Sequence, residues 1–243
     1  MTTSGSTSFN MEFTEIAEEA WERAGREMRS GYDLRTARRS MNLLTIEWAN
    51  RGINMWTIEE GSIALNNGQS TYDLPLDTID LLEHVVRTGT GQNQQDLSIS
   101  RISVANYATI PTKTAPGRPI QIWVQRLSGQ TYPATSGYEP SDTANPRVTL
   151  WPVPDQDNYY TFVYWRMRRI QNTGEGINTA DMPFRFYPCL VAGLAYYIAM
   201  KVPELAERIQ MLKAVYDEQF DLAAGEDREK ASERFVPRIY TPN

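Results

Sequence analysis

Hydrophobic residues recur every three or four positions in two N-terminal segments, the spacing that places apolar side chains on one face of an α-helix. The apolar positions are Phe13, Ile16, Ala17, Ala20, Trp21, Ala24 and Met28 in the first segment, and Leu34, Ala37, Met41, Leu44 and Trp48 in the second. Asn10 and Asp33 are the expected N-caps, and Ser30-Gly31 and Gly52 are the expected ends. Because only a few residues connect the segments, the sequence predicts two antiparallel helices.

After Gly52 the pattern changes to short runs rich in β-branched and aromatic residues, separated by Gly, Asn and Pro. Such runs are typical of strands joined by loops. The expected strands are 61–65, 70–74, 81–87, 121–127, 147–151 and 159–166. Asn67-Gly68, between the first two, favours a β-hairpin. Several short strands in succession predict an antiparallel β sandwich or small barrel, and not alternating βαβ units.

Two further helices are expected near the C-terminal end. The first has Pro188 in its opening turn and apolar residues around nearly the whole cylinder, so neighbours must bury it on several sides. The second begins at Pro203 and ends at Ala224-Gly225. One apolar stripe runs along this second helix: Leu205, Ile209, Leu212, Tyr216 and Phe220.

These elements predict an α+β chain in which an antiparallel helical bundle is interrupted by an inserted β domain. Residues 10–52 and 183–225 form the bundle, two helices from each end of the sequence, and residues 53–182 form the inserted antiparallel β sandwich or barrel. Residues 1–9 are an expected flexible N-terminus, and residues 226–243 an extended C-terminal arm. The arm ends in an apolar and basic cluster beyond a polar stretch, which favours docking on a partner; the alternative is a tail packed on its own domain.

Composition and charge indicate a globular protein without a strong affinity for nucleic acid. Of 243 residues, 41% are hydrophobic and 22% charged, and the formal net charge is −6. Binding along a phosphate backbone requires clustered cations, so specific DNA binding is not expected. The longest nearly apolar run, 189–200, is too short to span a bilayer, and no secretory signal is visible, so no membrane partner is expected.

The sequence offers little catalytic chemistry. Cys189 is the only cysteine and His84 the only histidine, so neither zinc ligation nor a Cys/His nucleophile is available, and no cofactor motif occurs. The best acidic cluster is Asp73, Asp77 and Asp80, for which turn and capping roles are expected, with a cell-wall hydrolase as the enzymatic alternative. Aromatic residues in 159–165 fit a strand covered on both faces; stacking on nucleic-acid bases is the alternative.

Several segments, taken in order, resemble the head-to-tail adaptor proteins of short-tailed bacteriophages, of the tail tubular protein A type. The segments are Trp48–Gly52, Met55–Gly61, the stretch through Asn67-Gly68 to Tyr72–Pro75, Asp77 and Asp80–Leu82, Tyr164–Arg166, and Asp181–Leu190. The resemblance covers about residues 10 to 225 and lies in pattern and order.

The resemblance implies a virion structural protein and no enzymatic activity. Such proteins form a ring of twelve copies in the neck, between the portal protein and the tail nozzle protein, through which DNA passes without specific binding. Assembly in the host cytoplasm and contacts of the β loops with the nozzle or tail fibres are implied as well. The C-terminal extension would grip the portal, which makes these residues the expected portal-binding segment: Arg234, Phe235, Val236, Pro237, Arg238, Ile239 and Tyr240.

Closure of a ring requires two different complementary faces on each subunit. Charged residues of the first two helices are candidates for ion pairs between neighbouring subunits, with solvated helix faces as the alternative. The expected interface residues are Glu15, Glu19, Glu22, Arg26, Arg35, Arg38 and Arg39. The alternative function is a receptor- or carbohydrate-binding tail module with a helical oligomerisation domain.

Overall fold

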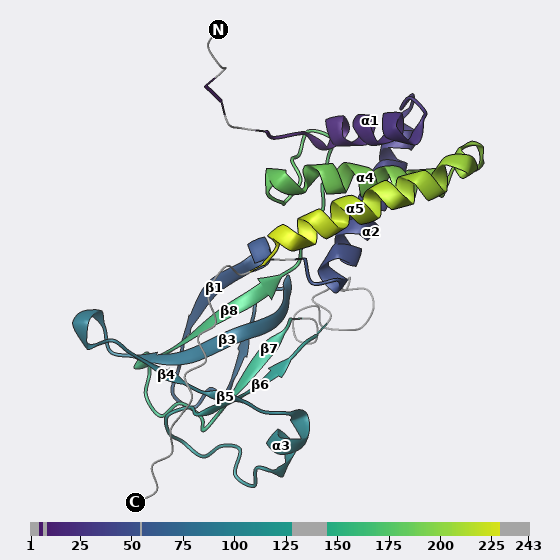
Figure 1. Ribbon diagram of the computed structural model, residues 1–243. Coiled ribbons are helices and arrows are strands. Elements are labelled where there is room, and N and C mark those ends of the chain that lie inside the picture. Colours follow the sequence, from purple (N-terminus) through teal and green to yellow (C-terminus); the bar gives the residue numbers. More distant parts are fainter. Residues whose placement is uncertain (1–4, 7–8, 54, 128–144, 229–243) are drawn as a thin grey trace, which may run out of the picture. The chain divides into compact units, whose positions relative to one another are not determined.

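The computed structural model describes residues 5–6, 9–53, 55–127 and 145–228 and divides the chain into two compact units (Figure 1). A helical unit comprises Met1–Trp56 and Gln171–Asn243, and a β unit comprises Thr57–Ile170. The helical unit contains α1 (Phe13–Ala24), α2 (Gly31–Asn50), η4 (Phe184–Phe186), α4 (Tyr187–Ala199), η5 (Pro203–Arg208) and α5 (Ile209–Glu226), and η1 (Met55–Thr57) spans the boundary. The β unit contains β1 (Ile58–Ala64), β2 (Thr71–Asp73), β3 (Thr78–Thr88), η2 (Gly91–Asn93), β4 (Gln95–Ser98), β5 (Ser100–Arg101), α3 (Val104–Thr109), β6 (Gln121–Gln125), β7 (Arg147–Trp151) and β8 (Tyr160–Arg168).

The two N-terminal helices begin at residues that satisfy otherwise unpaired backbone N–H groups. Glu12 caps α1 in a capping box, in which the Glu15 carboxylate accepts the backbone N–H of Glu12 at 2.8 Å. Ser30 caps α2, and its Oγ accepts the backbone N–H of Asp33 at 3.3 Å. The N-caps predicted at Asn10 and Asp33 are therefore wrong, because the extended backbone of a cap occurs at Glu12 and Ser30 instead.

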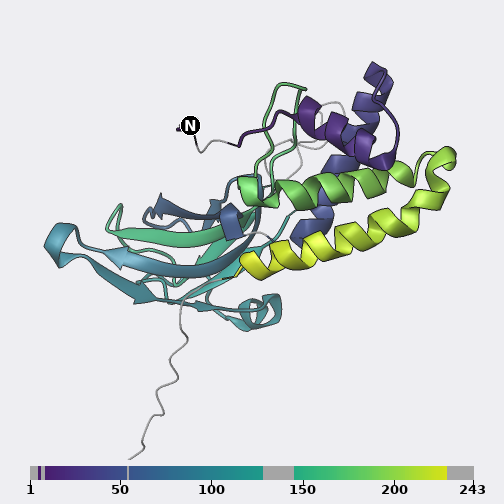
Figure 2. The ribbon, with the colours of Figure 1, turned by 45° about the horizontal axis from the view of Figure 1, so that its top comes forward.

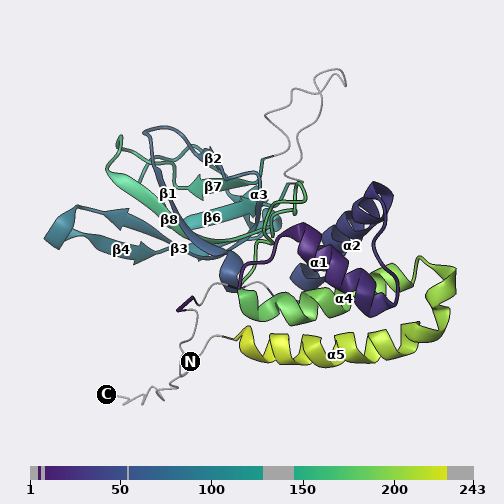
Figure 3. The ribbon, with the colours of Figure 1, turned by 90° about the horizontal axis from the view of Figure 1, so that it is seen from above.

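Helix α4 is the apolar centre of the helical unit. Its side chains are buried around most of the helix, which confirms the prediction that neighbours cover it on several sides. Figure 2 shows α5 running alongside α4, and Figure 3 shows α4 lying between α2 and α5. Gly193 permits this close packing: a Cβ there would lie 2.8 Å from Tyr216 of α5 and 2.9 Å from Leu44 of α2.

A polar network crosses the apolar core and links three of the helices. The Nε1–H of Trp48 on α2 donates to the Oη of Tyr216 on α5 at 3.0 Å. The hydroxyls of Tyr216 and of Tyr197 on α4 both donate to the carboxylate of Glu47, and Arg51 forms a salt bridge with the same carboxylate. Polar groups in a core need such partners, so the network fixes the relative positions of α2, α4 and α5.

Two four-stranded sheets, ordered β1-β8-β3-β4 and β2-β7-β6-β5, share one core in the β unit. The core side chains come from both sheets and their connections: Leu65, Tyr72, Leu74, Leu81, Val86, Ile122, Val148, Leu150, Tyr160, Phe162 and Tyr164. In the first sheet, β8 pairs antiparallel with β1 and with β3. The predicted α+β class is confirmed, whereas the antiparallel bundle arrangement of the helices stays a prediction.

The hairpin predicted at Asn67-Gly68 is wrong. The strand before the turn pairs with β8 and the strand after it pairs with β7, so the turn connects the two sheets. Its backbone bonds to another loop, since the Asn67 N–H donates to Asp157 at 2.8 Å and the Gly68 N–H donates to the Pro154 carbonyl at 2.9 Å. The sequence specifies a turn here, but the partners of the flanking strands are set by distant residues.

Two further expectations about the β unit need correction. The described strands form two separate sheets, so the barrel alternative is wrong, and β5 pairs with β6 in parallel, so the sheets are not wholly antiparallel. A parallel pair needs a crossover connection, and this one contains α3, which the sequence pattern did not predict. Ser103 caps α3 by accepting the backbone N–H of Asn106 at 3.2 Å.

Candidate interaction surfaces

The two side chains with potential nucleophilic or acid–base chemistry lie in packed surroundings. Cys189 is buried on α4, and this burial raises the pKa of its thiol to about 12. His84 on β3 is half-buried beside the Phe162 ring, and burial lowers the pKa of its imidazole. Both groups are therefore neutral near pH 7. Within the described ranges, no three His, Cys, Asp or Glu residues gather as metal ligands would.

The acidic cluster considered for hydrolysis is divided among arginines. Asp73 pairs with Arg147 at 2.7 Å, and Asp77 pairs with Arg166 at 2.6 Å. Asp80 pairs with Arg101 at 2.8 Å and with Arg126 at 3.3 Å. Each carboxylate thus has its own cationic partner and tethers a strand or loop. This arrangement fits the structural role expected for the three aspartates.

Several of the charged residues expected at a subunit interface have partners within their own chain. Glu15 completes the capping box of α1, and Glu19 pairs with Arg23 at 2.7 Å. Arg26 lies over the Trp21 ring, with 5.6 Å from its guanidinium carbon to the ring centroid. Arg38 donates to the Gly174 carbonyl at 3.0 Å, and Arg39 donates to the Thr36 hydroxyl at 3.3 Å. Glu22 and Arg35 are exposed on α1 and α2.

Helices α2 and α5 keep apolar side chains on their outer faces. On α2 these are Leu43 and Ile46, which are 54% and 57% exposed. On α5 they are Met211, Val215 and Leu222, which are 51%, 40% and 62% exposed. The stripes predicted from the sequence are the core stripes and do not include these residues. Their spacing of three or four residues indicates a second apolar stripe on each helix.

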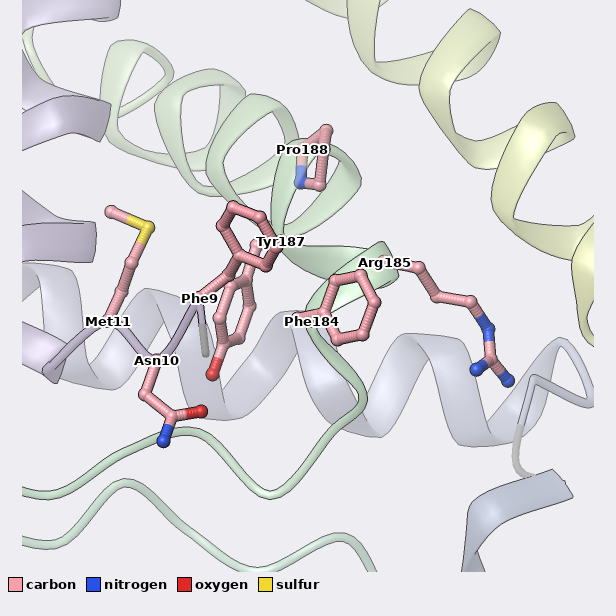
Figure 4. A pocket seen from close by; sticks show the side chains of 7 residues that line it. All are labelled: Phe9, Asn10, Met11, Phe184, Arg185, Tyr187 and Pro188. Atoms are coloured by element: carbon pink, nitrogen blue, oxygen red, sulfur yellow. The ribbon is translucent and has the colours of Figure 1, made fainter. Parts of the chain in front are cut away.

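An open hollow of about 560 Å³ lies beside the first turn of α4. The residues around it are Phe9, Asn10, Met11, Phe184, Arg185, Tyr187 and Pro188. The rings of Phe9 and Phe184 have centroids 5.6 Å apart, and both side chains are more than half exposed. Figure 4 shows the Arg185 side chain extending away from Asn10 and Met11. The hollow is apolar and holds no cluster of catalytic groups.

The β3–β4 hairpin forms part of the surface of the β unit. The two strands pair up to Thr88 opposite Gln95, and η2 lies in the connection between them. A bidentate ion pair joins Arg87 on β3 to Asp96 on β4, with N–O distances of 2.8 and 2.9 Å.

The predicted portal-binding segment, Arg234 to Tyr240, lies outside the described residues. The described chain reaches residue 228, just beyond the end of α5. There the carboxylate of Asp227 accepts the backbone N–H of Met55 at 3.2 Å. A truncation that preserves this contact must therefore start after residue 228.

Comparison with known proteins supplies the functional context for these surfaces. The family model described as SU10 adaptor protein matches residues 11–240, almost the whole chain. A search of curated proteins finds no match. None of the described helices combines the length and the apolar character needed to cross a membrane. The family match confirms the resemblance to phage head-to-tail adaptors found in the sequence.

Proposed function

Because the chain belongs to the SU10 adaptor protein family, we propose that it forms a ring at the head-to-tail junction, between the portal protein and the tail nozzle. The family is one of structural phage adaptors, components of the virion neck or tail that associate with other parts of the particle. The match over residues 11–240 is the observation that carries the proposal. The function of such a protein depends on the shape of the ring and on the surfaces that bind other parts of the particle.

The residue chemistry of the described chain supports this function. The aspartates that a hydrolase would need are each paired with arginine, and the thiol of Cys189 is buried. The formal net charge of −6 lets a ring pass DNA without holding it, since retention requires clustered cations along the phosphate backbone. Twelve copies around the passage remain our expectation from the resemblance.

We further propose that the segment Arg234–Tyr240 attaches the ring to the portal. It combines arginines with apolar and aromatic side chains, the residue types that dominate binding energy at protein interfaces. The closing residues of α5 and the Asp227–Met55 contact precede it, so the segment can be removed without cutting a described helix.

The test uses the purified protein, its portal and two variants. Negative-stain microscopy and sedimentation should show rings of the wild type seated on the portal. Deletion of residues 229–243 should keep the circular dichroism and thermal midpoint of the wild type but abolish attachment. A matched variant in which Phe235, Ile239 and Tyr240 become serine should behave like the deletion.

A wild-type protein that neither forms rings nor binds the portal would refute the proposed function. A deletion variant that still attaches would place the portal contact elsewhere on the chain. A lower thermal midpoint after the deletion would show that the arm packs on its own domain, which is the alternative considered for it in the sequence.

A further inference from the structure

We propose that the ring is held together by the outer face of α2 on one subunit and the outer face of α5 on the next. The inference rests on the proposed ring and names the surfaces that build it. It follows from four properties of the helical unit: two exposed stripes that combine apolar and charged residues, the opposite charges of these stripes, a spacing that sets Arg39 against Glu218, and their places on two different faces.

The outer stripe of α2 consists of Tyr32, Arg35, Arg39, Leu43 and Ile46, spaced three or four residues apart. Residues at this spacing lie above one another on one face of a helix. All five are exposed, and Tyr32 is 64% exposed. The inner face of α2 is occupied by core residues such as Leu44 and Trp48, so this outer stripe has no function in the core.

The outer stripe of α5 consists of Met211, Val215, Glu218 and Leu222, again spaced three or four residues apart, with Asp217 and Asp221 beside it. All six of these residues are exposed. The core side of α5 carries Leu212, Tyr216 and Ala223. Solvent-facing apolar residues are common singly, but a row of them along one helix is typical of a helix-in-groove or helix–helix contact.

The two stripes have complementary charge. Arg35 and Arg39 form no ion pair within the described residues, and neither do Asp217, Glu218 and Asp221. Stripe α2 is therefore cationic and stripe α5 anionic. Pairing of α2 with α2, or of α5 with α5, would bring like charges together, which disfavours a two-fold symmetric dimer. Pairing of α2 with α5 brings opposite charges together and suppresses wrong partners.

The spacing of residues in the two stripes sets a cation of one against an acid of the other. From the N-terminal end, α2 presents an aromatic residue, two arginines and then two aliphatic residues. From the C-terminal end, α5 presents Leu222, the acidic pair Asp221 and Glu218, and then Val215 and Met211. Parallel packing, counted from Tyr32 and Met211, sets Arg39 against Glu218 and Leu43 against Leu222. Antiparallel packing that sets Arg39 against Glu218 also sets Ile46 against Met211. The pair Arg39–Glu218 therefore forms in either direction.

The position of the stripes suits repeated head-to-tail association. The core sides of α2 and α5 meet through the Trp48–Tyr216 hydrogen bond, so the exposed stripes of the two helices are two different faces of the helical unit. A contact between two different faces of identical subunits is heterologous, and it gives a ring when the rotation closes. Each subunit thus offers one α2 face and one α5 face.

The decisive experiment uses two assembly-defective variants of the full-length protein. Variant A carries Leu43→Glu and Ile46→Glu, which replace the apolar contacts of the α2 face with charges. Variant B carries Met211→Glu and Val215→Glu, which do the same on the α5 face. Both faces become acidic, so the altered faces repel one another. We expect A and B, each with portal present, to lose the ring seen with the wild type. Lys213→Glu, on an exposed part of α5 away from the stripe, is the matched control and should keep the ring.

Mixing the variants tests the heterologous geometry. A retains an intact α5 face and B an intact α2 face, so the mixture should give a one-to-one heterodimer that cannot extend, measured by native mass spectrometry. The heterodimer also proves that both variants are folded. Rings formed by A or B alone, or a mixture that stays monomeric, would overturn the inference.

A charge exchange tests the pairing of Arg39 with Glu218. Arg39→Glu and Glu218→Arg should each weaken assembly, and the chain carrying both changes should recover it, because the pair is reversed at every interface. A double variant that assembles no better than either single one would overturn the pairing of Arg39 with Glu218. Absence of rings from the wild type with portal would instead refute the proposed function, so the two failures are distinguishable.

Discussion

The hydrogen bond between Trp48 and Tyr216 gives a quantitative prediction about the stability of the helical unit. The two side chains are 0% and 2% exposed, and the indole N–H donates to the phenol oxygen at 3.0 Å. Tyr216→Phe removes the oxygen and leaves the ring in place. The indole N–H then has no acceptor in a site that water does not reach. A buried donor left unpaired costs about 1–3 kcal/mol of unfolding free energy.

The matched control is Tyr196→Phe. Tyr196 stacks on Tyr216, with ring centroids 6.1 Å apart, but it is only partly buried and its hydroxyl makes no hydrogen bond within the described residues. Loss of the Tyr196 hydroxyl should change the free energy of unfolding by less than about 0.5 kcal/mol. Urea unfolding followed by circular dichroism at 222 nm reports mainly on the helices, so the two variants can be compared in one transition.

A double-mutant cycle isolates the bond itself. Trp48→Phe removes the donor, so in the double variant no unpaired indole N–H remains. The two single losses should therefore exceed the loss in the double variant by about 1 kcal/mol, within the range usual for contacting residues. Equal losses for Tyr216→Phe and Tyr196→Phe, or strict additivity in the cycle, would refute the reasoning.

Three further predictions concern other parts of the chain. Burial, together with a hydrogen bond to Glu47, raises the pKa of Tyr197 to about 12. Tyrosine in the unfolded chain ionises near pH 10. The free energy of unfolding should therefore fall by about 1.4 kcal/mol per pH unit between pH 10 and pH 12 because of this group. In urea titrations Tyr197→Phe should reduce the slope by this amount; the remaining slope comes from Cys189 and Tyr216, whose pKa values are also raised by burial. Gly61→Ala would put a Cβ 2.5 Å from the Tyr164 ring and should cost about 1–3 kcal/mol through overpacking, whereas Ser62→Ala should not. Cys189 should react with a thiol reagent only as fast as the helical unit unfolds, because burial keeps the thiol protonated.

The sequence predicted the four long helices because each buries a stripe of side chains against the same core. The predicted end of the first helix at Ser30-Gly31 is wrong, since α1 ends at Ala24, and a 3-10 helix from Pro203 precedes the start of α5 at Ile209. The predicted inner positions of α1 and α2 are almost all buried, and the all-round apolar pattern of α4 corresponds to a helix covered on several sides. Strand β7 begins and ends at the predicted residues, Arg147 and Trp151. In these cases the local pattern and the tertiary environment agree.

The sequence-based predictions of the β unit are wrong where the partner of a strand is distant in the chain. The turn at Asn67-Gly68 has the local sequence of a hairpin, but β1 finds its partner in β8, where Gly61 lies opposite Tyr164. No local preference encodes that pairing. Helix α3 spans only Val104–Thr109 and has no buried residue, so it leaves no stripe to detect.

Prediction of the candidate surfaces is also limited by partners that the local sequence does not reveal. The charged residues of α1 and α2 stood out in the sequence, but Glu15 and Glu19 prove to have intramolecular partners. The exposed stripes on α2 and α5 escaped notice because their apolar residues are too few to change the dominant core periodicity. A stripe that serves a partner chain becomes visible only once the core stripe is known.

Helices α2 and α5 carry core contacts on one side and the proposed subunit contacts on the other, which allows stability and assembly to be separated experimentally. Tyr216→Phe acts on the inner side, so it should lower the unfolding free energy but leave rings intact at temperatures where the helical unit remains folded. Met211→Glu with Val215→Glu acts on the outer side of the same helix, one residue away, and should abolish rings while the thermal midpoint stays that of the wild type. If both variants lost stability and assembly in proportion, the rings would depend on the fold as a whole, and no specific α2–α5 contact would be needed to explain them.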